Sequence, residues 1–74
     1  MKRTFSVLIE RDEDGVYVGS IPELKGCHTQ GETLDELMDN IREAAELCLE
    51  VQKQKKEKIE ELKFVGVQQI EVAA

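Results

Sequence analysis

A helix-start signal at residues 33–36 divides this chain into two parts with different hydrophobic periodicity. The four residues read Thr-Leu-Asp-Glu, which is the form of a capping box. In a capping box the Thr33 hydroxyl accepts a hydrogen bond from a first-turn N–H, and the Glu36 carboxylate reaches back to the cap amide. Apolar residues alternate before this signal and follow helical spacing after it, so the sequence predicts an α+β fold.

The first predicted strand covers residues 3–11. Phe5, Val7 and Ile9 share one face of it, because the side chains of a strand alternate between its two faces. The opposite face is polar except for Leu8. We therefore expect this second face of the sheet to be only partly exposed to water.

Glycine and proline mark the ends of two more predicted strands. The Asp-Gly pair at residues 14–15 predicts a hairpin, since glycine adopts positive φ without steric cost, and a second strand follows over residues 16–21. Proline cannot donate to a ladder, so residues 22–26 are predicted to form a turn that a glycine closes. Residues 27–30 are then a short third strand.

The helix predicted after the capping box is amphipathic. Apolar side chains lie within about 60° of Ile41 on a helical wheel: Leu34, Leu37, Met38, Ala44, Ala45 and Cys48. Acidic residues occupy most of the remaining surface, and Leu47 lies about 120° from the apolar stripe, as a contact residue would. The periodicity continues to Leu62. One helix over residues 33–62 would be about 45 Å long and would outreach the sheet, so we expect a bend or break within residues 52–58.

Residues 64–72 are β-rich and predict a fourth strand. Their alternation changes phase near residues 68–69, as it does in a strand with a bulge or with two buried faces. The predicted order is therefore βββαβ, in a single domain over residues 1–74, with one long helix, intact or broken, packed on one face of the sheet.

A domain of 74 residues is only marginally stable when no disulfide or metal ion cross-links it. Its two cysteines and one histidine supply neither a disulfide framework nor a metal cage, and we expect Cys27 and Cys48 to be reduced thiols that act as small apolar side chains. Self-association as a homodimer or higher oligomer is the expected compensation. Its predicted contacts lie on the uncovered sheet face and the last strand: Leu8, Phe64, Val65, Val67 and Ile70.

The net charge of −6 is concentrated in the middle of the chain. Residues 10–50 contain twelve acidic and three basic residues, so this segment suits a basic partner and not a nucleic-acid backbone. A lysine run over residues 53–58 is interrupted by glutamate, which is typical of a solvated helix end. No apolar run is long enough to cross a membrane and no leader follows Met1, so we expect a cytoplasmic protein without a membrane partner.

No catalytic, cofactor-binding or metal-binding residues are predicted. Four carboxylates cluster near the first turn, but a two-metal centre needs ligands from several elements, and an EF-hand needs a longer ordered loop. These four are Glu10, Asp12, Glu13 and Asp14. His28 is the sole imidazole, and no nucleophile accompanies it in the sequence. We interpret the turn as solvated and His28 as structural, and keep a residual metal-dependent nuclease as the weakest alternative.

Four segments in order resemble the HicB-like antitoxin family. They are DGVYV at residues 14–18, IPELKGC at 21–27, TQGETLDE at 29–36 and EAA at 43–45. The family pattern has an acidic turn with Asp-Gly, a P-x-L-x-G-C turn, a T-Q-G-x-T entry into a helix and a final strand. The resemblance covers about residues 4–72, and the combination is more specific than any single segment.

This resemblance implies a truncated ribonuclease H-like sheet and the role of antitoxin in a type II toxin–antitoxin pair. Such an antitoxin is not an enzyme; it binds a small basic HicA-like toxin that cleaves mRNA and covers the active site of that toxin. Many family members carry a helix-turn-helix or ribbon-helix-helix module, which these 74 residues do not include, so direct DNA binding by this chain alone is not expected. The alternative function is a stand-alone oligomeric scaffold or a small-ligand-binding module without a toxin.

Two surfaces are the predicted contacts with a protein partner. The turn over residues 22–26 exposes backbone groups, and the acidic helix face surrounds Leu47. The predicted partner-binding residues are Pro22, Glu23, Leu24, Gly26, Asp39, Glu43, Glu46 and Leu47. The sequence alone does not decide between the two surfaces.

Overall fold

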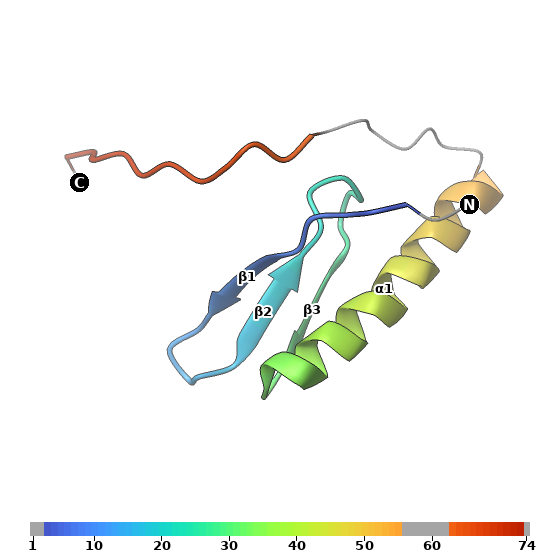
Figure 1. The fold of residues 1–74 in the computed structure, drawn as a ribbon, viewed down its shortest axis with the longest axis horizontal. Helices are drawn as coiled ribbons and strands as arrows, with labels where there is room; N and C mark the ends of the chain where they lie inside the picture. Colours follow the sequence, from blue (N-terminus) through green and yellow to red (C-terminus); the bar gives the residue numbers. More distant parts are fainter. Residues whose placement is uncertain (1–2, 56–62, 74) are drawn as a thin grey trace.

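Three antiparallel strands form a sheet, and one long helix packs on one of its faces (Figure 1). The computed structural model describes residues 3–55 and 63–73. Its elements are β1 (Leu8–Arg11), β2 (Tyr17–Ser20), β3 (His28–Gly31) and α1 (Leu34–Lys55), and the strand order is β1-β2-β3. The predicted α+β class and the order of three strands followed by a helix are confirmed.

Asp12 organises the turn between β1 and β2. Its Oδ1 accepts hydrogen bonds from the N–H groups of Asp14 and Val16, both at 2.9 Å. Gly15 has a φ of 84°, which a residue with a Cβ adopts only with strain. The predicted hairpin at the Asp-Gly pair is therefore confirmed, and the Asp12 carboxylate is engaged in holding the turn.

The loop between β2 and β3 folds inward through three backbone hydrogen bonds. The Ile21 N–H donates to the Cys27 carbonyl at 3.0 Å, and the Cys27 N–H donates to the Leu24 carbonyl at 3.0 Å. The Leu24 N–H donates to the Ile21 carbonyl at 3.1 Å. Because all three side chains are buried, this loop contributes to the core as well as reversing the chain.

The capping box starts α1 as predicted, with one difference. Thr33 Oγ1 accepts a hydrogen bond from the Glu36 N–H at 3.0 Å. Glu36 Oε2 accepts from the Glu32 N–H at 3.4 Å, one residue before the cap amide. Asn40 Nδ2 donates to the Gln30 carbonyl at 2.9 Å, so a second side-chain bond attaches the start of the helix to β3.

The core lies between α1 and the sheet, against which α1 packs at β2 and β3. Ile41 of α1 packs with Ile21, Leu24 and Cys27 of the loop. Partly buried apolar residues surround this cluster: Phe5, Val7, Ala44, Ala45, Cys48 and Leu49. Most of the apolar stripe predicted around Ile41 therefore faces the sheet, except Leu34 and Met38, which are 47% and 38% exposed, while the acidic residues of α1 face water.

The first and last predicted strands differ from the structure. β1 begins at Leu8, and residues 3–7 precede it outside the ladder. The fourth strand predicted over residues 64–72 does not join the sheet, because residues 63–73 run clear of it and are exposed (Figure 1). A strand exists only through ladder bonds to a neighbour, and this segment has none among the described residues of the single chain.

The predicted length of the helix is only partly covered by the structure. α1 continues to Lys55, and the rest of the segment predicted to be helical, with most of the expected break, lies outside the described residues. Across the described ranges, no helix is long and apolar enough to traverse a lipid bilayer.

Candidate partner-binding surface

One side of α1 is a continuous row of carboxylates. We call this row the acidic ridge; it consists of Asp35, Asp39, Glu43, Glu46 and Glu50. All five residues are exposed. They recur every three or four positions, which places them on one side of a helix with about 3.6 residues per turn. Like charges at this spacing repel one another, so a basic partner laid along the ridge would relieve that repulsion.

An apolar groove of about 400 Å³ lies between α1 and residues 3–7. We call it the N-terminal groove. Phe5 lines it from the N-terminal segment, and Met38 and Leu49 line it from the helix. Arg3 also lines the groove, with its guanidinium carbon 5.2 Å from the centroid of the Phe5 ring. The groove thus combines an apolar lining with positive charge at the N-terminal segment.

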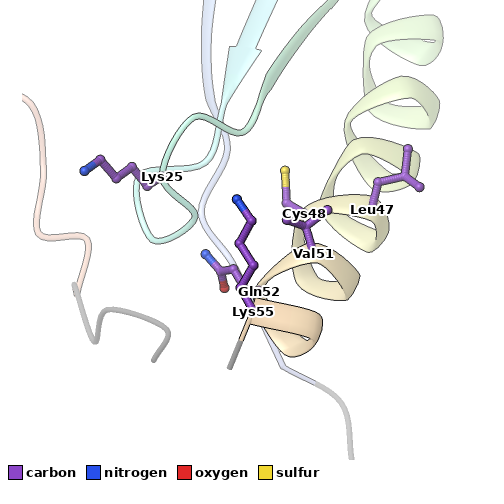
Figure 2. Close-up of a pocket in the computed structure, with 6 residues that line it drawn as sticks. All are labelled: Lys25, Leu47, Cys48, Val51, Gln52 and Lys55. Carbon is purple, nitrogen blue, oxygen red and sulfur yellow. The ribbon is translucent and has the colours of Figure 1, made fainter. Parts of the chain in front are cut away.

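A second groove, of about 290 Å³, lies between the 22–26 turn and the C-terminal half of α1 (Figure 2). We call it the turn–helix groove. Lys25 comes from the turn and the other five residues come from α1: Leu47, Cys48, Val51, Gln52 and Lys55. Leu47 is 62% exposed and Val51, one helical turn further on, is 46% exposed. On a helical wheel the acidic ridge lies between the two grooves, so charge and apolar surface alternate across α1.

Cys27 and Cys48 meet where the loop packs on the helix. Both are free thiols; Cys27 is buried, and Cys48 is half-buried and lines the turn–helix groove. Burial raises the pKa of the Cys27 thiol to about 12, and a hydrogen-bonding contact with Cys48 adds to the increase. Cys27 is therefore an uncharged thiol near neutral pH and packs as a small apolar side chain, as expected from the sequence.

The 22–26 turn presents fewer contact residues than the sequence predicted. Pro22 and Gly26 are exposed, but Leu24 is fully buried and offers no side-chain surface to a partner. We therefore correct the prediction and remove Leu24 from the candidate surface; as an apolar residue in a tight loop, it closes the core instead. Glu23 is half-buried, and its Oε2 accepts a hydrogen bond from the Ser6 N–H at 3.3 Å, so it fastens the N-terminal segment to the turn.

The predicted helix residues lie on one continuous surface. Asp39, Glu43 and Glu46 belong to the acidic ridge, and Leu47 lies beside it in the turn–helix groove. From the turn only Lys25, which was not among the predicted contacts, lines this groove, so whether the turn and the helix face bind one partner stays a prediction. Val51 was not predicted from the sequence to line the groove. Its position four residues after Leu47 would have placed it on the same side of the helix.

The predicted oligomer contacts lie elsewhere. Leu8 is half-buried in β1. The four residues of the C-terminal segment are exposed: Phe64 at 43%, Val65 at 93%, Val67 at 74% and Ile70 at 84%. These residues are therefore not part of the acidic ridge or of either groove on α1.

The acidic first turn and His28 show no arrangement for chemistry. Asp12 holds the turn, and His28 is an exposed residue of β3. Among the residues that the structure describes, no three His, Cys, Asp or Glu side chains are placed to hold a metal ion. The sites with shape and charge are therefore the ridge and the two grooves, which suit binding.

Comparison with known proteins identifies the family to which this chain belongs. The profile of the HicB-like antitoxin of bacterial toxin–antitoxin systems matches residues 5–72, nearly the whole chain. The chain is a member of the HicB-like antitoxin family. The resemblance noted in the turns and at the helix start is thereby confirmed.

Relatives and a solved structure agree with this assignment. A UPF0150 protein of Synechocystis is 55% identical over 71 residues, which are 96% of this chain and 97% of the relative. A UPF0150 protein of Archaeoglobus fulgidus is 53% identical, over 92% of this chain and 93% of its own length. The N-terminal domain of the Burkholderia pseudomallei antitoxin HicB is 30% identical with a TM-score of 0.67, over 82% of this HicB-like chain and 72% of that chain.

Proposed function

We propose that this HicB-like chain is a non-enzymatic antitoxin that binds a small basic mRNA-cleaving toxin of the HicA type and masks its active site. The observation that carries the proposal is the acidic ridge with the apolar turn–helix groove beside it, presented by a helix that the capping box and the core hold in place. The family membership supports the antitoxin role. The proposed place of action is the cytoplasm, where mRNA is the toxin's target.

The acidic ridge supports a basic partner through charge. A protein that cleaves mRNA must itself bind phosphates and therefore carries a positive surface near its catalytic centre. Carboxylates in a row on α1 are complementary to that surface, and exposed charges of this kind accelerate encounter and orient the two proteins. An antitoxin that occupies a cationic surface excludes RNA from it. Masking then follows from charge competition without any catalytic group on this chain.

The turn–helix groove supports specific docking beside the ridge. Leu47 and Val51 are apolar and exposed on one side of α1, and Lys25 and Lys55 also line the groove, with Lys25 across it on the turn. Interfaces gain most of their binding energy from a few apolar anchors surrounded by polar residues, and this groove has that composition. Direct DNA binding by this chain alone is not part of the proposal, because its described helix is dominated by carboxylates.

Binding to a purified HicA-type toxin tests the role of the ridge. The double variant Asp39→Lys, Glu43→Lys should slow association by about tenfold or more at low salt, and the effect should shrink as salt is added. The matched control Glu13→Lys, Asp14→Lys makes the same change in net charge on the exposed first turn and should bind nearly as the unchanged protein does. Equal losses in both variants would show that only the overall charge matters and would contradict a role for the ridge.

A second pair of variants tests the groove. Leu47→Asn with Val51→Asn should weaken the complex about tenfold or more, mainly through faster dissociation. Leu34→Asn is the control, since Leu34 is 47% exposed on α1 but lines neither groove. In cells, the unchanged protein should restore growth when the toxin is expressed, and the groove variant should not. Cleavage of RNA by this chain alone would overturn the non-enzymatic part, and failure to bind any HicA-type toxin would favour the scaffold or small-ligand alternative.

A further inference from the structure

The C-terminal segment, residues 64–72, has the residue types of a strand but pairs with no strand in the part of the chain that the structure describes. Four of its side chains are almost fully in water, with exposures of 93% for Val65, 84% for Ile70 and 74% for both Val67 and Val72. β-branched residues are favoured in strands and disfavoured on exposed, irregular chain. In Figure 1 the segment runs extended and clear of the sheet. It therefore offers both unpaired backbone groups and unburied apolar surface.

The sheet has an open edge on which such a strand can add. β2 is central, so β1 and β3 are the edges. The edge at β3 is partly covered by α1, whose Asn40 side chain donates to the Gln30 carbonyl. At the β1 edge, residues 3–11 have no ladder neighbour other than β2 within the described part of the chain. An uncovered edge of this kind presents free N–H and C=O groups to an incoming strand.

The N-terminal groove lies beside this open edge. Phe5 and Val7 line it from the edge segment, and Met38 lines it from α1. The opposite face of the same edge carries the half-buried Leu8. A strand added here would place alternate side chains in the groove and over Leu8, so it needs apolar residues on both faces. Residues 64–72 have them, because Val65 and Val67 share one face while Ile70 and Val72 share the other.

We infer that residues 64–72 of a second copy of this chain add to the β1 edge as the missing fourth strand, and that the exchange is reciprocal in a two-fold dimer. The segment of nine residues matches the nine residues of the edge over 3–11. Within 64–72 only Glu71 is charged, and the edge and groove together have a small positive balance, with three arginines, Arg3, Arg11 and Arg42, against two glutamates, Glu10 and Glu46. A two-fold dimer buries both exposed segments and both open edges at once, whereas addition to any other protein leaves one segment in water.

The exchange would supply the stability that a small domain without a disulfide or a metal ion lacks. Each copy would gain the strand that completes its core and would lose its exposed apolar segment, which is the compensation expected for a chain of this size. Of the acidic ridge, only Glu46 also lines the N-terminal groove, so the exchange leaves the rest of the ridge and the turn–helix groove uncovered. The dimer therefore does not depend on the proposed toxin, and the two proposals can fail independently.

Light scattering coupled to gel filtration tests the inference with the full chain and no toxin present. The unchanged protein should have twice the chain mass of 8.4 kDa. Val67→Pro removes a ladder N–H and should give the single-chain mass with unchanged helical circular dichroism, because Val67 is exposed in the single chain. Val67→Thr keeps the N–H and the strand preference, and should remain a dimer.

A mixing experiment distinguishes exchange between copies from closure within one copy. Met38→Asp places a charge in the N-terminal groove at a residue that is 38% exposed, so it should also give monomers while leaving the core intact. Equal amounts of the Val67→Pro and Met38→Asp proteins should recover part of the dimer, since each supplies the half that the other lacks. An unchanged protein that is monomeric with protected amides over 64–72 would show closure within one copy and overturn the inference. A dimer that survives both substitutions would place the interface elsewhere and overturn it too.

Discussion

Gly31 is the position at which this fold is most sensitive to one added methyl group. A Cβ at Gly31 would lie 2.6 Å from the backbone nitrogen of Leu37 and 2.9 Å from its Cα. Both atoms belong to the helix backbone, so no change of rotamer relieves the contact. The first turns of α1 must instead move away from β3 by several tenths of an ångström, which lifts the fully buried Leu37 out of its packing.

Gly31→Ala should therefore cost about 3 kcal/mol of unfolding free energy, the upper end of the usual range for overpacked cores, because the neighbour that must yield is backbone. For a domain of this size such a loss corresponds to a fall in melting temperature of about 12–24 °C. Urea and thermal unfolding followed by circular dichroism measure both quantities at fixed protein concentration.

Gly66→Ala is the matched control for this substitution. No atom of the single chain lies within 4 Å of a Cβ built at Gly66. When both substitutions are measured in the Val67→Pro protein, which removes the proposed dimer, the change at Gly66 should alter the unfolding free energy by less than about 0.5 kcal/mol. A Gly31→Ala protein as stable as the control would refute the close packing of α1 on β3. Because α1 carries the acidic ridge, the Gly31→Ala protein should also bind a toxin less well than the control.

Two further predictions concern the helix cap and the buried thiol. Thr33→Ala should lower the unfolding free energy by about 1 kcal/mol through loss of the bond to the Glu36 N–H, whereas Thr33→Ser should retain most of it; urea unfolding of the two variants checks this. The pKa of Cys27 is raised from 9.0 to about 12, so the contribution of its protonated thiol to stability is complete below pH 9 and is lost as the pH rises toward 12. Between pH 9 and pH 12 the unfolding free energy of the unchanged protein should therefore fall more steeply than that of the Cys27→Ala protein. Alkylation followed by mass spectrometry at pH 8 should modify Cys48 well before Cys27, and equal rates would contradict the burial.

Local sequence patterns predicted the parts of the fold that nearby residues complete. The hairpin depends on Asp12 and Gly15, and the helix start depends on Thr33 and Glu36, each pair separated by three residues. Their hydrogen bonds close within a few positions of the chain, so the residue types alone are sufficient. The amphipathic stripe around Ile41 followed from periodicity for the same reason.

Contacts between distant residues were beyond this reasoning. Leu24 was assigned to a surface because turns are usually exposed, yet the hydrogen bonds of its loop direct the side chain into the core. The contact between Cys27 and Cys48, and the groove that Lys25 shares with α1, depend on how the loop packs on the helix. No local pattern specifies the distance between two elements that are twenty residues apart in sequence.

The sequence by itself determined which elements form and which of their faces are apolar or acidic, because these properties depend on spacing along the chain. Only the tertiary structure decided which surfaces adjoin: it formed a groove between Lys25 of the turn and α1, placed the acidic ridge between two grooves, and left residues 64–72 without a ladder among the described residues. The physical reason is that burial and strand pairing are properties of distant partners. A segment with every preference of a strand becomes one only when a free edge lies within its reach.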